Sequence, residues 1–435
     1  MPTAPRPRRL SSRRLLADTT PLRNPYFRRL WTANIVTVVG AQLTVVAVPA
    51  QIYQITGSSA YVGLTGVFGL VPLIVFGLWG GALADVFDRR RILIVTTLCL
   101  IGCSALFWAQ AALGVGNVWL LLSVFAVQQA FFAVNQPTRT AVLPRLLPLT
   151  ELPAANSLNM TVMQAGAIAG PLVGGALIPV LGYATLYLVD TLSLLATLWA
   201  VLRLPVLRPE LADGQRRPAA GLRSVLDGFR YLRDHRVLLA SFLVDLIAMI
   251  FGMPRALFPQ MAHESFGGPE GGGLAFALLF AAISLGSVIG GVFSGWVVRV
   301  RRQGLAVIVC ILIWGAAISV AGGALFFAHG TALPMLPVVV VALMVGGAAD
   351  MASAAFRQTM LQAAATDNVR GRLQGVFIVV VAGGPRIADV THGATAAVVG
   401  TAVATAGGGL AVIVLTIVAA LAIPAFVRYR AGQLA

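Results

Sequence analysis

Three ionisable residues stand close together in a long apolar run of this 435-residue sequence. Arg386, Asp389 and His392 follow one another at intervals of three within "GGPRIADVTHG". A charge at the depth of a bilayer core costs roughly 2.5–3.5 kcal/mol, so such residues persist where they are paired or needed. Two interpretations are open. Arg386 and Asp389 neutralise each other beside a Gly-Pro kink, or the stretch is a moving, wetted gate in which His392 shares a proton.

Further acids lie in other apolar runs. Asp245 and Asp350 have no basic residue three or four positions away, so each must find a partner on another helix, face a wet cavity or be protonated. Asp190 is expected on a supporting helix. The candidate proton-exchanging groups are Asp245, Asp350, Arg386, Asp389 and His392.

Uncharged polar residues in the first half of the chain are the other candidates for lining a cavity. The four residues predicted to do so are Gln42, Gln128, Asn135 and Gln164. We expect about half of the polar residues in these spans to make hydrogen bonds between helices instead.

The composition is that of a polytopic α-helical membrane protein. Hydrophobic residues make up 58% of the chain and charged residues 11%, with a mean hydropathy of +0.88. All 31 basic residues are arginine, which excludes a lysine Schiff base and argues against a Walker-type ATP site. The three cysteines show no metal-ligand spacing. We therefore expect no metal, no cofactor and no enzymatic activity.

The apolar runs predict twelve membrane-spanning helices, because a bilayer core of roughly 30 Å needs about 20 residues per helix. The predicted spans are residues 31–54, 60–84, 92–113, 117–143, 154–180, 183–204, 237–261, 273–298, 304–328, 335–361, 372–399 and 403–427. Arginines collect in both tails and after the even-numbered spans, which predicts that both termini are cytoplasmic. Arg255, Arg357 and Arg386 fall outside this scheme. Arg139 and Arg357 are expected to snorkel toward the cytoplasmic ends of their helices.

A polar, Pro-rich segment splits the spans into two sets of six. The predicted units are a basic tail at 1–30, six-helix halves at 31–204 and 237–427, a linker at 205–236 and a short tail at 428–435. In the linker, "LRSVLDGFRYLRDHR" favours an amphipathic helix on anionic lipid over a plain solvated segment. Two sequence echoes share an offset of 214, "GPLVGGA" with "GPRIADV" and "GALADVFDRRR" with "GWVVRVRR". They indicate parallel six-span repeats.

The turn after the second span, "GGALADVFDRRRIL", carries a recognisable pattern of residues. Its members are Gly81, Asp85, Arg89 and Arg90. With this turn the chain resembles the major facilitator superfamily over nearly its whole length. The resemblance implies a two-half transporter fold in which Asp85 locks the cytoplasmic side while the cavity faces outward. Val86 and Asp88 depart from the usual pattern, and a pairing of Arg139 with Asp85 is the alternative to snorkelling.

A second motif lies in the fifth span, within "GAIAGPLVGG". Its residues are Gly166, Gly170, Pro171, Gly174 and Gly175. Glycines four apart let helices touch and the proline bends the helix. The segment resembles the fifth-helix motif associated with antiporters, although a close-packed, kinked helix is an alternative reading. "VAVPAQIYQITGSSAYVGL" and "FRQTMLQAAATDNVRGRLQGV" resemble the branch that holds the enterobactin exporter and drug-efflux proteins.

These resemblances imply a secondary transporter that exports small amphiphilic molecules, a siderophore-like compound or a drug, by proton antiport. A metabolite importer or facilitator of the same fold and a non-transporting membrane sensor are the alternatives. The expected partners are a small-molecule substrate, protons and anionic lipid. We expect a monomer in the cell membrane. The net charge of +16 collects on the predicted cytoplasmic loops, so no nucleic-acid partner is expected.

Overall fold

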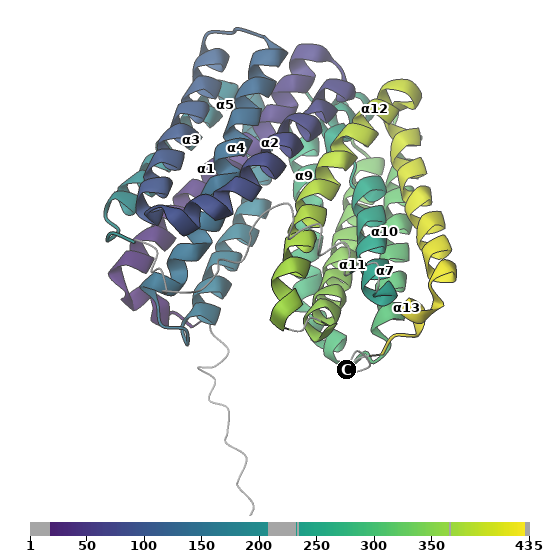
Figure 1. Cartoon of the computed structure of the whole chain (residues 1–435). Coiled ribbons are helices and arrows are strands. Elements are labelled where there is room, and N and C mark those ends of the chain that lie inside the picture. The colour runs from purple at the N-terminus through teal and green to yellow at the C-terminus, as the bar shows by residue number, and fades with distance from the viewer. Residues whose placement is uncertain (1–17, 208–231, 233–234, 365–366, 431–435) are drawn as a thin grey trace, which may run out of the picture.

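The computed structural model describes residues 18–207, 232, 235–364 and 367–430, with the side chains of all of these except 78–86, 298 and 362–379. Every regular element in this part of the chain is helical (Figure 1). The main helices of the first half are α1 (Pro25–Thr56), α2 (Ser59–Val86), α3 (Arg89–Ala112), α4 (Val118–Leu146) and α5 (Leu152–Leu202). Those of the second half are α7 (Arg236–Gly252), α9 (Leu274–Val292), α10 (Gln303–Leu325), α11 (Met335–Ala364), α12 (Asp367–Ala422) and α13 (Pro424–Arg428).

Ten helices in the described part of the chain are long and apolar enough to cross a membrane. Two of them, α5 and α12, contain 51 and 56 residues, more than twice what one crossing needs. Each is interrupted by a glycine with a left-handed backbone, Gly182 at φ 71° and Gly400 at φ 83°. Since each long helix supplies two crossings, the ten helices are consistent with the twelve predicted spans. The predicted span boundaries agree with the helices to within several residues.

Local sequence accounts for where several helices begin. Asn24 and Asn117 accept hydrogen bonds from the first free backbone N–H groups of α1 and α4. Asp88 does the same for α3 and also accepts a bond from the backbone of Leu207 at 3.1 Å. The loops therefore stay short and the helices begin at defined residues.

The two halves lie side by side, and each packs mainly within itself (Figure 1). In the first half α1 packs along α5, α2 along α4, and α3 along both α4 and α5. In the second half the corresponding contacts are α7 along α12, α9 along α11, and α10 along both α11 and α12. The halves meet where α2 contacts α12 and where α5 contacts α9.

These two contacts between the halves involve equivalent positions of the two sequence repeats. A Cβ placed on Gly175 of α5 would lie 2.9 Å from Cα of Ala277 in α9. A Cβ placed on Gly63 of α2 would lie 2.6 Å from the carbonyl oxygen of Asp389 in α12. Asp389 lies 214 positions after Gly175, and Ala277 lies 214 positions after Gly63. The offset of the sequence repeats thus also relates the two contacts between halves.

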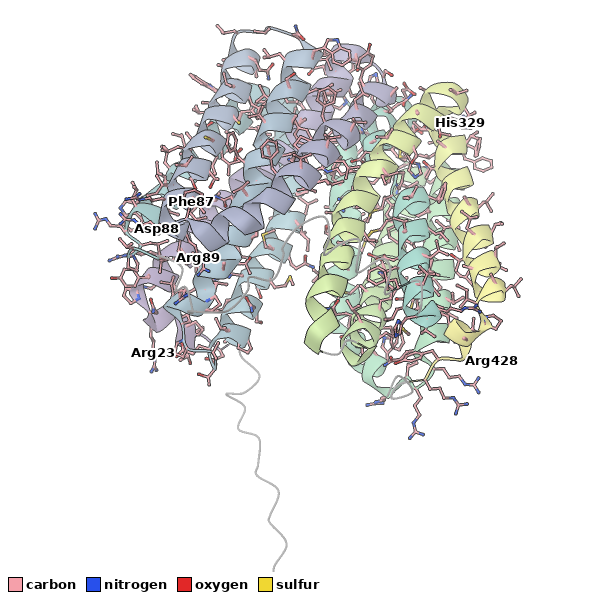
Figure 2. All side chains as sticks on the ribbon, in the orientation of Figure 1. Arg23, Phe87, Asp88, Arg89, His329 and Arg428 are labelled. Carbon is pink, nitrogen blue, oxygen red and sulfur yellow. The ribbon has the colours of Figure 1, made fainter. Side chains whose placement is uncertain are left out.

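Polar contacts between the halves gather toward one end of the molecule. The Tyr53 hydroxyl donates to Glu264 Oε1 at 2.9 Å, and Ser59 Oγ donates to Gln260 Oε1 at 2.6 Å. Figure 2 shows Arg23 and Arg428 at the opposite end, away from His329. Toward that opposite end the ribbons of the two halves diverge (Figure 1).

The predicted seventh span differs from the structure in its second part. Helix α7 ends at Gly252, and Met253 and Pro254 interrupt it because proline lacks the backbone N–H that would continue the helix. The chain resumes as η3 (Arg255–Leu257), α8 (Phe258–Gln260) and a π-helical turn η4 (Met261–Ser265). The predicted amphipathic helix in the linker lies outside the described residues, as does most of the basic N-terminal tail.

Candidate functional site

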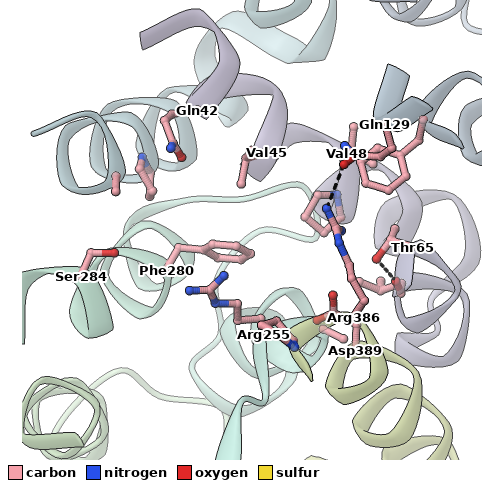
Figure 3. Close-up of a pocket in the computed structure, with 17 residues that line it drawn as sticks. Gln42, Val45, Val48, Thr65, Gln129, Arg255, Phe280, Ser284, Arg386 and Asp389 are labelled. Atoms are coloured by element: carbon pink, nitrogen blue, oxygen red, sulfur yellow. Dashed lines mark hydrogen bonds between the residues drawn. The ribbon is translucent and has the colours of Figure 1, made fainter. Parts of the chain in front are cut away.

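A cavity of about 410 Å³ lies between the two halves (Figure 3). The first half contributes apolar and amide side chains to it, among them Gln42, Val45, Val48, Phe125 and Gln129. The second half contributes Phe280, Ser284 and the charged residues Arg255, Arg386 and Asp389. Pro171 and Pro385, the matching prolines of the echoed segments "GPLVGGA" and "GPRIADV", both line it. The cavity therefore lies at the interface of the repeats.

Arg386 reaches across the cavity instead of pairing along its own helix. Its Nη2 donates to Gln129 Oε1 at 3.2 Å, and its guanidinium lies 5.4 Å from the ring centre of Phe125. Among the described residues it forms no ion pair, with Asp389 or with any other acid. The self-contained Arg386–Asp389 pair considered from the sequence is thus absent from this conformation, because the arginine points to α4 of the other half.

His392 points away from the cavity. It is 4% exposed, and its Nε2 lies 3.1 Å from the backbone oxygen of Phe251, next to the break that ends α7. The i, i+3 spacing therefore brings Arg386 and Asp389 to the cavity and places His392 within the second half. Proton sharing between His392 and the other two residues has no support from this arrangement.

Arg255 is a cavity residue that was absent from the predicted site. It is exposed, and it lies directly after the break at Met253 and Pro254, which turns it out of the α7 path into the cavity. Its charge interacts with the carboxylates of Asp350 and Asp389, yet it forms no hydrogen bond or ion pair with the described residues. The sequence signal was present, since Arg255 falls outside the topological pattern of arginines and follows a proline.

A second charged group lies inside the second half. Arg357 of α11 forms an ion pair with Asp245 of α7 and lies 3.8 Å from Asp350 Oδ1. The side chains of Arg357 and Asp245 are 6% and 1% exposed, whereas that of Asp350 is 27% exposed. The expectation that Arg357 snorkels is wrong, because its charge is used inside the bundle. Asp245 finds the partner across helices that its unpaired position required.

Asp190 of the first half has a different environment. It is 2% exposed, and its Oδ2 accepts hydrogen bonds from Thr44 at 2.7 Å and Ser104 at 2.8 Å. These residues come from α1 and α3, so the acid ties three helices together. As predicted from the sequence, Asp190 lies on a supporting helix and is not among the described residues of the cavity wall.

The predicted polar cavity residues divide into two groups. Gln42 lines the cavity, and Gln129 lies where its neighbour Gln128 was predicted. Gln128 and Gln164 are partly exposed but are not among the described lining residues. Asn135 is buried and donates to Thr96 Oγ1 at 2.8 Å, so it makes one of the expected bonds between helices.

The turn between α2 and α3, which carries the pattern of Gly81, Asp85, Arg89 and Arg90, is held by contacts of its arginines with backbone carbonyl oxygens. Arg90 donates to the carbonyl oxygen of Leu202, at the C-terminal end of α5, at 2.7 Å. Arg89 contacts the carbonyl oxygen of Ala141 at 3.4 Å. A cation at a helix C-terminus is stabilised by the helix dipole. The side chains of Gly81 and Asp85 lie outside the described ones, so the lock formed by Asp85 and its pairing with Arg139 stay predictions.

The fifth-span glycines pack against two different partners. Gly166 and Gly170 are in close contact with Val38 and Gln42 of α1, and a Cβ on Gly174 would lie 2.8 Å from Leu43. Gly175 faces α9 of the other half. The motif thus brings α5 close to α1 on one side and to the second half on the other. No group of His, Cys, Asp or Glu in the described residues could hold a metal ion.

Comparisons with known proteins cover nearly the whole chain. Residues 17–430 match the model of a family described as transmembrane secretion effectors of the major facilitator type. The enterobactin exporter EntS of Escherichia coli O1:K1 and that of Shigella boydii serotype 18 are each 28% identical over 415 residues, covering 94% of both chains. A POT family transporter crystallised with a thioalcohol-conjugated peptide superposes with a TM-score of 0.71 at 12% identity, covering 92% of this chain and 96% of that chain. A bacterial Spinster homologue in an inward-facing, unoccupied conformation gives 0.67 at 15% identity, covering 94% and 97%.

Proposed function

The chain belongs to the transmembrane secretion effector family of major facilitator transporters, and from this premise we propose that it exports a small amphiphilic molecule by proton antiport. The observation that carries the proposal is the cavity at the repeat interface, where apolar and charged side chains meet. The similarity to enterobactin exporters over 94% of both chains favours a siderophore-like cargo, and a drug of similar character is the second cargo class.

The arrangement of the halves supports loading from the cytoplasm. The halves are joined by polar contacts at the end that holds Tyr53 and Glu264, and they diverge toward the end that holds Arg23 and Arg428. Arginine placement predicts that this divergent end faces the cytoplasm. An exporter must accept cargo from that side, so this conformation suits the loading step.

The group formed by Asp245, Asp350 and Arg357 is the proposed proton site. Two carboxylates share one guanidinium there, so one negative charge lacks a full counter-charge within this group of described residues. Asp350 is the more exposed carboxylate and the more distant from Arg357. A proton on Asp350 would balance the group, whereas Asp245 stays tied to Arg357.

Uptake into proteoliposomes under an imposed pH gradient tests this function, with radiolabelled enterobactin as the first probe. Proton antiport predicts accumulation against the concentration gradient when the lumen is acidic, and its collapse when nigericin dissipates the gradient. Accumulation driven by an acidic exterior would identify a symporter, and gradient-independent equilibration a facilitator. A non-transporting sensor would move no probe under any of these conditions. The same measurements with a panel of drugs test the second cargo class.

The Asp350→Asn variant tests the proton site in the same vesicles. It should lose gradient-driven accumulation while probe exchange across the membrane continues, because exchange requires no net proton movement. Arg428→Gln, at the exposed end of α13, serves as the matched control for a charge change outside both groups. Full gradient-driven accumulation by Asp350→Asn would move the proton site elsewhere.

A further inference from the structure

The cavity carries an excess of positive charge. Its described ionisable lining residues are two guanidinium groups, Arg255 and Arg386, and one carboxylate, Asp389, a formal charge of +1. We propose that Arg255 and Arg386 form a subsite for a planar oxyanion such as a carboxylate, carried by a ligand with an apolar or aromatic body. The identification of this ligand as cargo rests on the proposed transport function; the subsite itself does not.

Among the described residues, Arg255 has no direct counter-charge. The break after Gly252 places it in the cavity wall, where it is exposed and forms no hydrogen bond or ion pair with the described residues. An exposed guanidinium whose five N–H donors make no such bond is available to an incoming ligand. The neighbouring carboxylates of Asp350 and Asp389 act on it only at longer range. An incoming oxyanion would supply the missing partner.

Arg386 is oriented by neutral groups that leave most of its donors available. A guanidinium has five N–H donors, and Gln129 accepts one of them at 3.2 Å. The ring of Phe125 lies under the guanidinium at 5.4 Å and adds a contact without adding negative charge. Arginine presents its remaining donors as a planar fork that matches a carboxylate. The side chain is therefore held in position and still carries its charge.

The rest of the wall suits the body of such a ligand. Val45 and Val48 of α1 and Phe280 of α9 form apolar surface around the two arginines. Figure 3 shows the guanidinium of Arg255 beside Phe280 and that of Arg386 extending toward Gln129. The cavity volume of about 410 Å³ lies within the range of small-molecule sites. Charged head and apolar body can thus be accommodated together.

Equilibrium binding to the full chain in nanodiscs tests the subsite with three probes that share a naphthalene body and differ in charge. The probes are radiolabelled 2-naphthoate, which is anionic, 2-naphthamide, which is neutral, and 2-naphthylmethylammonium, which is cationic. We expect 2-naphthoate to bind about tenfold more tightly than 2-naphthamide, the usual effect of a charge-assisted hydrogen bond. Equal affinity for anion and amide, or tighter binding of the ammonium probe, would overturn the proposal.

Variants separate the subsite from general damage to the protein. Arg255→Gln and Arg386→Gln should each remove most of the preference for 2-naphthoate over 2-naphthamide, whereas Arg428→Gln should keep it. Asp389→Asn raises the formal cavity charge from +1 to +2 and should tighten 2-naphthoate binding severalfold. Such a gain cannot arise from misfolding. If Asp389→Asn leaves anion affinity unchanged and both arginine variants keep the preference, the subsite does not exist.

The binding measurement uses no gradient, so the two proposals fail separately. Retained anion preference without uphill transport would remove the export function and leave the subsite. Uphill transport without anion preference would remove the subsite alone.

Discussion

The two halves of this protein share a helical repeat but bury different chemistry. In the first half, the buried acid Asp190 is satisfied by the hydroxyls of Thr44 and Ser104. In the second half, Asp245 is buried to the same extent but is compensated by a full charge on Arg357. The repeat positions show the same difference: the positions 214 residues before Arg386, Asp389 and His392 are Leu172, Gly175 and Ile178. In the described lining of the cavity, the first half therefore supplies a neutral wall and the second half the charges.

Within the second half, the two charged groups have opposite excess charge. The cavity group has two guanidiniums and one carboxylate, whereas the group around Arg357 has two carboxylates and one guanidinium. An excess of positive charge suits an organic anion, and an excess of negative charge suits a proton. Arg255 interacts electrostatically with both groups through Asp389 and Asp350. This separation lets substitutions affect one ligand without the other.

The largest expected effect comes from breaking the charged pair of the second half. Arg357→Gln leaves Asp245 buried without its counter-charge, which should destabilise the protein by about 3–5 kcal/mol. Unfolding in detergent, followed by circular dichroism during titration with SDS, measures this loss. The double variant Arg357→Gln with Asp245→Asn should recover most of it, because the only carboxylate that then lacks Arg357 is that of Asp350, which is 27% exposed and can be solvated. A double variant as unstable as the single one would show that Arg357 acts through packing.

The close contact of α5 with α1 in the first half gives the next effect. Gly170 touches Gln42 directly, so Gly170→Ala must displace α1 and should cost about 1–3 kcal/mol. The matched control is Gly102→Ala in α3, where a Cβ meets nothing within 4 Å. Alanine there should stabilise by roughly 0.5–1 kcal/mol through helix propensity. The same SDS titration compares the two variants. Equal changes in the free energy of unfolding would mean that α1 and α5 can accommodate the added methyl group.

The fold could be predicted from the sequence much further than the site could. Span lengths and arginine placement depend on local composition, and the glycines that break α5 and α12 fall between predicted spans. The pairing of Arg357 with Asp245 depends on how α7 and α11 are rotated about their axes, which spacing within one helix does not specify. The same reason explains why Gln129 rather than Gln128 faces the cavity. Arg255 was missed because the seventh span was predicted to be continuous through Pro254.

Contacts that join the halves should have intermediate energies. Tyr53→Phe removes the hydrogen bond to Glu264, which should cost about 1 kcal/mol and favour separation of the halves at that end about fivefold. Electron paramagnetic resonance distances between spin labels on the two halves at that end would report the shift. Tyr26→Phe, remote from the interface between halves, is the control. An unchanged distance distribution for Tyr53→Phe would mean that the apolar contacts between α2 and α12 hold this end closed by themselves.

The smallest effect is expected for the acid of the first half, and it sharpens the contrast between the halves most directly. Both hydrogen bonds to Asp190 end on the same oxygen, Oδ2, so the single carbonyl oxygen of asparagine can accept both. Asp190→Asn should therefore change the free energy of unfolding by less than about 0.5 kcal/mol, since the weaker hydrogen bonds to a neutral acceptor are offset by no longer burying a charge. Asp245→Asn makes the same chemical change at a side chain 1% exposed, but it leaves the guanidinium of Arg357 to Asp350 alone, 3.8 Å away. That variant should lose several kcal/mol in the same titration. If the two aspartate variants are equally unstable, burial alone sets the cost of a charge in both halves, and the division into a neutral wall and a charged half is wrong.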